Sequence, residues 1–512
     1  MSPHHVQSQG TVRGTRRLRI VSLAALLLLV FTVGIWSYIR FNKAQATFDS
    51  VAVLPFVNVS GDKEAEFLSD GISETLINKL TKLRAFRVTA RTTAFHYKGK
   101  VTALQQIGKE LGVGAILTGT VLQRGDLLQI QVDLIDTADG TQIWGERYSS
   151  KESELLDVQQ KIVREVSEHL RLKLSGEQEQ QVAKRDTENA EAYKFYLKGR
   201  YYWNKRRNAD NLRKAIEHFQ KAVDHDPTYS LAYVGLADAY VLLEQYAGAP
   251  SVKTFLEAIA YAQRALQIDS SLAEAHASLG YAYGNLWQWA EAEKHYKLSI
   301  GLNPKYPTAR QWYCLYLRAM GQSDEALAQI KIAQELDPLS PAIQQNAVIV
   351  YLWKDDTTAV VEQAREMIEL DSNYPLGHSF LGLGYLSQGR NDEALIELQK
   401  GVELSKEPKR PQGLSRPLSY LGYGYAVAGK KAEALAIIEH LEETYGKTET
   451  TGVYIAAVYA GLGEKDQAFA WLYKDFDTHN GLLPTIKWYP MFKSLREDPR
   501  YTDLLWKMGL QP

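Results

Sequence analysis

The stretch Gly382–Leu404, GLGYLSQGRNDEALIELQKGVEL, shows the pattern that decides the fold of most of this chain. It combines a small residue, Gly382, with an aromatic residue three positions later, Tyr385, and a second small residue, Ala394. We interpret the stretch as two helices, the first around Gly382 and Tyr385 and the second around Ala394. Small residues at these positions let the two helices cross closely, and the aromatic ring packs between them.

The same pattern recurs along the second half of the chain. The small residues of the first helices are Gly199, Ala237, Gly280, Cys314, Val348, Gly382, Gly422 and Ala456, and four of the seven intervals between them are 34 residues. Three residues further on stand Tyr202, Tyr240, Tyr283, Leu317, Tyr351, Tyr385, Tyr425 and Tyr459, so an aromatic residue is present in seven of eight cases. The second helices carry Ala215, Ala258, Ala292, Ala326, Val360, Ala394, Ala434 and Ala468. A period of this length indicates an array of helical repeats.

Residues 190–479 therefore resemble the tetratricopeptide family, which implies an α-solenoid of about eight helix pairs. Because no helix pair can bury its apolar face alone, neighbouring pairs stack into a superhelix. Residues 480–512 break the repeat pattern but keep a helical apolar rhythm, so we expect them to cap the last pair.

The resemblance also implies a binding surface on the concave face of the array, which we expect to remain free. In this family, first-helix residues line that face and receive a peptide or a segment of a partner protein. Projected onto this chain, the groove residues are Tyr193, Tyr196, Arg200, Trp203, Tyr281, Asn285, Gln311, Arg318, Gln345, Trp353 and Tyr423. Tyr, Trp and Arg are enriched at binding hot spots, although each of these side chains could instead pack against the adjacent repeat.

An uncharged apolar run, residues 20–39 with the sequence IVSLAALLLLVFTVGIWSYI, stands before these parts. At about 1.5 Å a residue, a helix of this length spans the roughly 30 Å of a hydrocarbon core, so the run predicts a membrane helix. Four arginines lie in residues 1–19, and only Arg40 and Lys43 follow closely, which predicts a short cytoplasmic tail before the helix. The alternative is a cleaved signal peptide, because Ala44-Gln45-Ala46 has the small-x-small form of such sites. With either a membrane helix or a cleaved signal peptide, the rest of the chain is expected to be exported from the cytoplasm.

Residues 48–175 alternate between strand and helix signals. The run FDSVAVLPFVNV, from Phe48 to Val59, is typical of a buried strand, and DGISETLINKLTKL has apolar residues spaced as on one buried helix face. The runs AILTGTVLQ and LLQIQVDLIDT flank Arg124-Gly125-Asp126, which indicates a hairpin, and QIWGERYS follows as a third strand. With a closing helix over Glu154–Leu174, the order predicts a small α/β domain with one layer of helices on a mixed sheet.

Four blocks of this region, LPFVNVSGDKEAEFLSDGISETLINKL, RVTARTTAFHYKGK, ELGVGAILTGTV and IDTADGTQIWGERY, resemble the TolB-like N-terminal module in order and spacing. In bacteria this module stands between a membrane helix and helical repeats in CadC-type regulators and in some adenylyl cyclase or kinase chains. The resemblance implies a sensing or docking module of the cell envelope. Those relatives carry a winged-helix, cyclase or kinase domain before the membrane helix, where this sequence has 19 residues, so we expect neither direct DNA binding nor cyclic nucleotide synthesis.

The sequence contains none of the stronger catalytic or metal-binding signatures: no HExxH, no GxxxxGK[ST], no GxSxG and no cysteine pair. The 59 Lys and Arg residues nearly balance the 60 Asp and Glu residues, so no net field favours nucleic acid. The single cysteine, Cys314, is expected to be a buried small residue. We therefore predict no enzyme activity, cofactor, metal site or nucleic acid partner. An enzyme of unrecognised type would need a deep polar pocket with perturbed carboxylates in the α/β domain.

The architecture and the missing chemistry lead to one functional hypothesis. The chain is expected to be a single-pass protein of the bacterial inner membrane, mostly periplasmic, that acts as a scaffold or signalling adaptor and holds a protein or peptide segment in the repeat groove. The alternative is a sensory regulator without an output domain of its own, which signals through the membrane helix to a cytoplasmic partner. Homodimerisation through that helix would be its means of signalling.

Overall fold

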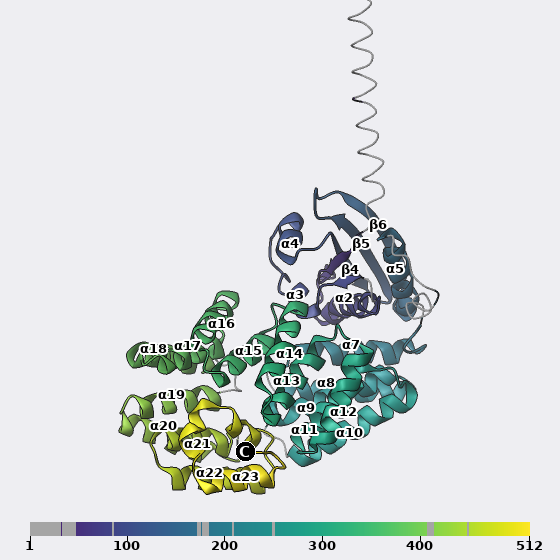
Figure 1. Ribbon diagram of the computed structural model, residues 1–512. Coiled ribbons are helices and arrows are strands. Elements are labelled where there is room, and N and C mark those ends of the chain that lie inside the picture. The colour runs from purple at the N-terminus through teal and green to yellow at the C-terminus, as the bar shows by residue number, and fades with distance from the viewer. Residues whose placement is uncertain are drawn as a thin grey trace, which may run out of the picture.

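The computed structural model of the chain describes residues 32, 48–83, 86–170, 176, 184–206, 209–247, 251–406, 414–447 and 450–512. It has three parts in sequence order: an α/β module, a solenoid of helix pairs and a C-terminal segment (Figure 1). Apart from Thr32, the predicted membrane helix over residues 20–39 lies outside the described residues. Within the described residues, no helix is both long enough and apolar enough to cross a membrane.

The α/β module is built on one mixed sheet. Its strands are β1 (Ser50–Val53), β2 (Val57–Asn58), β3 (Arg87–Val88), β4 (Ala115–Arg124), β5 (Leu127–Asp136) and β6 (Gln142–Lys151). Its helices are α2 (Glu66–Thr81), α3 (Arg91–Phe95), α4 (Leu104–Leu111) and α5 (Leu155–His169), with short 3₁₀ turns η1 (Lys63–Ala65) and η2 (Glu152–Glu154). In the order β3-β1-β4-β5-β6, β1 pairs in parallel with β3 and β4, and the last three strands are antiparallel. The mixed sheet and the hairpin at Gly125 are confirmed.

The first predicted strand is divided in two, because Pro55 stands in its middle. Proline has no N–H to donate to a sheet ladder. On either side of it, β1 pairs with Ala115–Leu117 and β2 with Thr120 and Val121 of the same strand, β4. At the break, the backbone N–H of Phe56 donates to a helix side chain, Ser73 Oγ of α2, at 2.9 Å.

Helices cover both faces of this sheet, which differs from the single helix layer that the pattern suggested. On one face, Ile72 of α2 and Val163 of α5 pack in one cluster with Leu117. On the other face, Ile107 of α4 packs with Ile116. Successive residues of a strand point to opposite faces, so the central strands are apolar on both sides and accept a helix on each.

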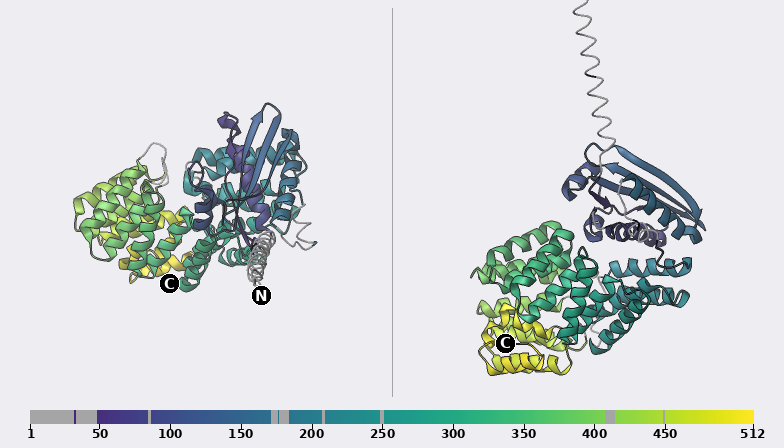
Figure 2. Two further views of the ribbon diagram at one scale, coloured as in Figure 1. Left: turned by 90° about the horizontal axis from the view of Figure 1, so that it is seen from above. Right: turned by 45° about the vertical axis from the view of Figure 1, so that its right-hand side comes forward.

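The solenoid consists of eight consecutive helix pairs within the described residues. The helices are α7 (Ala190–Asn204), α8 (Ala209–His225), α9 (Ser230–Ala247), α10 (Ser251–Ile268), α11 (Ala273–Asn285), α12 (Trp289–Leu302), α13 (Pro307–Met320), α14 (Ser323–Leu336), α15 (Pro341–Trp353), α16 (Thr357–Leu370), α17 (Pro375–Ser387), α18 (Asn391–Ser405), α19 (Ser415–Val427), α20 (Lys431–Thr444), α21 (Gly452–Gly461) and α22 (Lys465–Asp477). The pairs stack into a curved array, which confirms a solenoid of tetratricopeptide-like repeats (Figures 1 and 2).

The small first-helix residues lie where the two helices of a pair touch. A Cβ atom added to Gly199 would come within 2.5 Å of the Phe219 ring, and one added to Gly280 within 2.8 Å of the Tyr296 ring. Cys314, at the equivalent position of the fourth pair, is fully buried as expected, and burial raises the pKa of its thiol to about 11. Each large second-helix side chain therefore fills the space that the small residue leaves.

The C-terminal segment packs on the last pair and also reaches back to earlier pairs. It contains the 3₁₀ turns η3 (Leu483–Lys487) and η4 (Pro490–Leu495) and the helix α23 (Pro499–Lys507). Trp289 Nε1 of the third pair donates a hydrogen bond to the carbonyl of Met508 at 2.7 Å. Lys493 Nζ lies 2.6 Å from a carboxylate oxygen of Asp355, which follows α15. The segment therefore closes the curve of the array as well as covering its end (Figure 2).

Gly280→Ala is expected to destabilise the protein by about 1–3 kcal/mol, because the added methyl group must displace the packed Tyr296 ring. Gly301→Ala is the matched control on the opposite helix α12, where a Cβ atom would meet nothing within 4 Å. The control should be neutral or gain up to about 1 kcal/mol from helix propensity. Thermal unfolding followed by circular dichroism measures both, and equal changes would show that the helix crossing is not the constraint.

Candidate functional site

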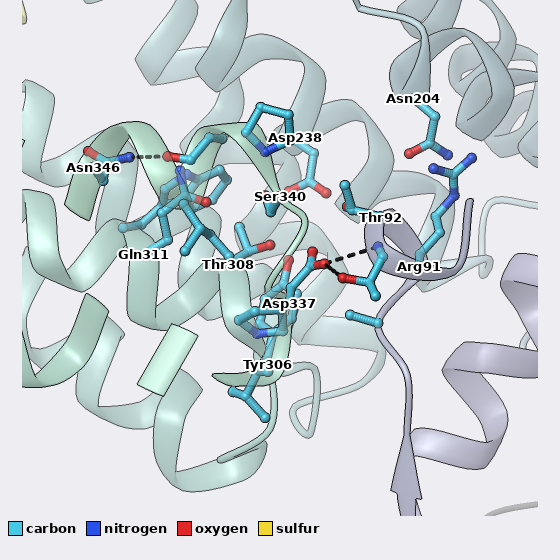
Figure 3. A pocket seen from close by; sticks show the side chains of 18 of the residues that line it. Arg91, Thr92, Asn204, Asp238, Tyr306, Thr308, Gln311, Asp337, Ser340 and Asn346 are labelled. Atoms are coloured by element: carbon cyan, nitrogen blue, oxygen red, sulfur yellow. Dashed lines mark hydrogen bonds between the residues drawn. The ribbon is translucent and has the colours of Figure 1, made fainter. Parts of the chain in front are cut away.

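A cavity of about 2040 Å³ lies on the inner side of the solenoid. It is larger than the roughly 300–1,000 Å³ of typical small-ligand pockets, so it has room for an extended segment or a large ligand. Its wall combines side chains of the α/β module, of the first helices of the pairs and of the C-terminal segment. Figure 3 shows Arg91 and Thr92 of the module across from Gln311 and Asn346 of the solenoid.

Eight of the eleven predicted groove residues line this cavity. They are Tyr193, Tyr196, Arg200, Trp203, Tyr281, Gln311, Arg318 and Gln345. The structure thus brings together residues from four helices, α7, α11, α13 and α15, that the repeat pattern placed on one face. Their role in binding a partner stays a prediction.

Asn285, Trp353 and Tyr423 do not line the cavity. The side-chain amide of Asn285 donates to the carbonyl of Tyr281 at 2.9 Å. Trp353 is partly buried among the apolar residues of the neighbouring pairs, and the Tyr423 ring packs against Gly461 of α21. The Asn285 amide is bonded to its own helix, and contacts between repeats occupy Trp353 and Tyr423. For the latter two, this is the packing role that the sequence left open for each groove residue.

The concave face is not the free groove that the resemblance implied. At its C-terminal end, Trp488 and Tyr489, which lie between η3 and η4, are buried and form part of the cavity wall. At its N-terminal end, α2 of the module packs on α7. The hydroxyl groups of Thr75 and Tyr193 lie 2.9 Å apart, and Tyr193 also donates to Gln159 Oε1 of α5 at 2.5 Å.

A buried carboxylate, Glu74 of α2, joins the module to the first helix pair. It accepts hydrogen bonds from Arg200 Nε at 2.7 Å, from Arg91 Nε at 2.8 Å and from Asn204 Nδ2 at 2.6 Å. Burial alone would raise the pKa of Glu74, but the charges of Arg200 and Arg91 lower it below its ordinary value. Arg200 Nη1 also lies 3.7 Å from Asp238 of α9, whose pKa burial raises to about 6. Charges of both signs therefore meet at this junction.

A second junction joins the module to the turn between α14 and α15. The backbone N–H and the hydroxyl of Thr93 donate to one oxygen of Asp337, at 3.1 and 2.7 Å (Figure 3). The Thr93 hydroxyl in turn accepts from the N–H of Leu339 at 3.2 Å. Burial raises the pKa of Asp337, although the hydrogen bonds from Thr93 oppose that shift. The module is therefore attached at separate points of the array, and between them its side chains form part of the cavity wall.

Apart from Arg200, sequence reasoning missed the main residues of both junctions: Glu74, Arg91, Thr93 and Asp337. Arg91 and Thr93 belong to the block RVTARTTAFHYKGK, and Glu74 belongs to LPFVNVSGDKEAEFLSDGISETLINKL. The sequence signal that could have pointed to these junction residues was their polar character within two blocks that resemble a known module. Nothing in the repeat pattern distinguishes Asp337, because an aspartate before proline is also an ordinary way to end a helix.

Comparison with protein families gives a match for the α/β module. Residues 46–165 match the family described as "HilA/YgeH-like transcriptional regulator, second domain". These bounds agree closely with the module observed in the structure. The likeness to the TolB-like module stays a prediction.

One curated relative is 31% identical to this chain over 246 residues. It is "Putative adenylate cyclase 3" of Rhizobium meliloti (strain 1021), and the match covers 48% of this chain. The chain spans 42% of the length of that relative, so the activity in its name is not carried over to this protein.

Solved structures resemble parts of the chain at low identity. A tetratricopeptide repeat protein from Parabacteroides merdae is 14% identical, covers 54% of this chain and 99% of its own, and has a TM-score of 0.38. The type IV pilus biogenesis factor PilW is 14% identical, covers 43% and 96%, and has a TM-score of 0.35. PilF of Pseudomonas aeruginosa is 18% identical, covers 42% and 93%, and has a TM-score of 0.32. These scores are low, so the description of the fold rests on the helix pairs themselves.

Glu74→Gln is expected to loosen the module from the solenoid, because it leaves Arg200 and Arg91 without their buried carboxylate. Removing one member of a buried ion pair costs about 3–5 kcal/mol. Hydrogen exchange should therefore accelerate in α2 and α7. Glu66→Gln, on the same helix, is the control, because Glu66 pairs with Lys98 near the surface and its loss should cost about 1 kcal/mol or less. Equal exchange rates in the two variants would exclude Glu74 as the joining residue.

Proposed function

We propose that this chain is a membrane-anchored interaction protein of the bacterial cell envelope that holds a segment of a partner protein in the cavity between its α/β module and its solenoid. The observation that carries the proposal is the cavity of about 2040 Å³, whose wall comes from both parts. Side chains from both parts can therefore contact one ligand from two sides.

The chemistry of the wall supports a polypeptide ligand. Gln311 and Gln345 are half-buried cavity residues on successive first helices, and each amide offers both a donor and an acceptor. An extended backbone presents alternating N–H and C=O groups, which such amides can satisfy. Tyr281 and Trp312 line the same cavity, with ring centroids 4.8 Å apart, and contribute apolar surface to its wall.

Membrane anchoring is part of the proposal and is supported by the uncharged apolar run over residues 20–39. With residues 1–19 in the cytoplasm, the module and the solenoid would face the periplasm as residues following the anchor. The cavity would then be available to envelope proteins.

A second candidate function is a sensory regulator that signals through the membrane helix. The description of the matched family, the second domain of a transcriptional regulator, favours it. In that case, ligand binding in the cavity would change how the module docks on the solenoid, and the change would be transmitted to a cytoplasmic partner.

Position-specific photocrosslinking in membranes tests the proposal. A photoreactive residue at Gln311 or Gln345 should capture the same partner protein, whereas the same residue at Ala328, which is exposed on α14, should not. Adducts that form equally from all three positions, or from none, would contradict the cavity as the binding site. A partner captured only from residues 1–19 would favour the regulator.

A further inference from the structure

Arg318 of α13 stands in the wall of the cavity with unusual surroundings for a charged side chain. It is 4% exposed, and its Nε and Nη1 atoms have no hydrogen-bond partner among the described residues. Its guanidinium lies 4.2 Å from the centroid of the Trp488 ring. Arginine remains protonated in proteins, so this is a buried cation with most of its donors unused.

Arg416, near the start of α19, is a second cation in the same wall. Tyr420 lies one helical turn after Arg416 on α19, and its hydroxyl bonds to that of Tyr489, the residue after Trp488, so both arginines lie at the same end of the cavity. Burial chiefly lowers the pKa of Arg318, and the charge of Arg416 acts in the same direction. Arg416 Nε donates to the hydroxyl of Tyr454 at 3.2 Å. None of the ion pairs between arginine and carboxylate in the described part of the chain includes either residue.

Tyrosine and tryptophan side chains also line this end of the cavity. The hydroxyl groups of Tyr420 and Tyr489 hydrogen-bond to one another, and Tyr489 stacks on Trp488 with ring centroids 4.4 Å apart. The carboxylates of the junctions that line the cavity have partners of their own: Glu74 binds Arg200, and Asp337 binds Thr93. Among the residues that the structure describes, no carboxylate forms an ion pair with either arginine at this end of the cavity.

Such an arrangement is unfavourable without a ligand. A buried ion that lacks a partner costs several kcal/mol, and the stacking of a guanidinium on an indole ring offsets only about 2 kcal/mol of that cost. An oxyanion would satisfy the unused N–H donors with short, charge-assisted hydrogen bonds, for which the planar guanidinium is well shaped.

We propose that Arg318 and Arg416 form a binding site for an oxyanion, a carboxylate or a phosphate group of a ligand, at the C-terminal end of the cavity. The indole ring of Trp488 forms one side of this site and orients the Arg318 guanidinium. The proposal rests on the same cavity as the proposed function and names the chemistry of its ligand.

The first test is calorimetric titration of the purified full-length protein with sodium phosphate and, separately, with sodium glutarate, at constant ionic strength set by sodium chloride. Saturable binding of either anion is expected, and Arg318→Gln or Arg416→Gln should weaken it about tenfold or more. Arg310→Gln is the matched control on the same helix, because Arg310 lies outside the cavity wall and donates to Gln329 and to the carbonyl of Pro304. It should leave the affinity unchanged.

Comparison of the two anions distinguishes between two chemical sources of the ligand's negative charge. Tighter binding of phosphate would indicate a phosphorylated ligand, and tighter binding of glutarate an acidic side chain or another carboxylic acid. Absence of saturable binding of both, or equal weakening by Arg310→Gln, would overturn the site. Since these probes are small ions, their failure would leave a partner crosslinked from Gln311 unaffected, so the two proposals fail separately.

The second test distinguishes a binding role from a structural one. If Arg318 serves a ligand, Arg318→Met removes an uncompensated buried charge while keeping an extended side chain, so the melting temperature without added anion should stay the same or rise. The same variant should lose anion binding. A lower melting temperature together with unchanged anion affinity would show that Arg318 only holds Trp488 in place, and would overturn the proposal.

Discussion

The close crossing of the two helices in each repeat is the constraint on which the rest of the structure depends. Gly199 against Phe219, Gly280 against Tyr296 and Gly382 against Leu398 leave no room for a side chain at the small position. Two helices held this closely bury only part of their apolar surface, and the remainder must be covered by the next pair. Repetition of one such step curves the array. The inner side of the curved array forms the cavity wall. The shape of the cavity therefore depends on helix crossings that are many residues away in the sequence.

A curved array alone would leave an open groove, and two additions at its ends turn the groove into a cavity. The α/β module is attached through Glu74 and Thr93, and the C-terminal segment is attached through Met508 and Lys493. These additions differ in charge as well as in fold. The module contributes one carboxylate, Glu74, which Arg200 and Arg91 satisfy, and one hydroxyl, that of Thr93, which donates to Asp337 of the solenoid. The C-terminal end places the Trp488 ring beside Arg318. At the module end, Glu74 and Arg200 satisfy each other, whereas at the other end Arg318 keeps N–H donors without a partner among the described residues, so a ligand should place its negative charge there.

The sequence predicted the elements that repeat at a short spacing, and it missed the contacts between residues that are far apart in the chain. The helix pairs, the hairpin at Gly125 and most groove residues follow from spacing, because side-chain direction in a helix or strand is periodic. Thr93 and Asp337 are 244 positions apart, and no periodic pattern relates them. Asn285 was misplaced for a different reason: its amide bonds to the carbonyl of Tyr281 one turn earlier on the same helix, and the repeat pattern does not specify such a local side-chain bond. Arg318 lines the cavity, and its contact with the Trp488 ring depends on the C-terminal segment, which has no repeat to predict it.

The two functional candidates differ in what a ligand must touch. A ligand shifts a conformational equilibrium only by the difference between its affinities for the two states. One that contacts the solenoid alone, for example through Gln311 and Gln345, binds equally well whether or not the module is docked, and the protein then acts as a scaffold. One that reaches from Arg318 to Arg91 or Thr92 contacts the solenoid and the module, so its binding is coupled to the junctions at Glu74 and Asp337. Coupling of this kind is reciprocal, which means that a variant with a weakened junction must also bind such a ligand less tightly. The response of ligand affinity to Glu74→Gln thus separates a scaffold from a sensor without knowledge of the downstream partner.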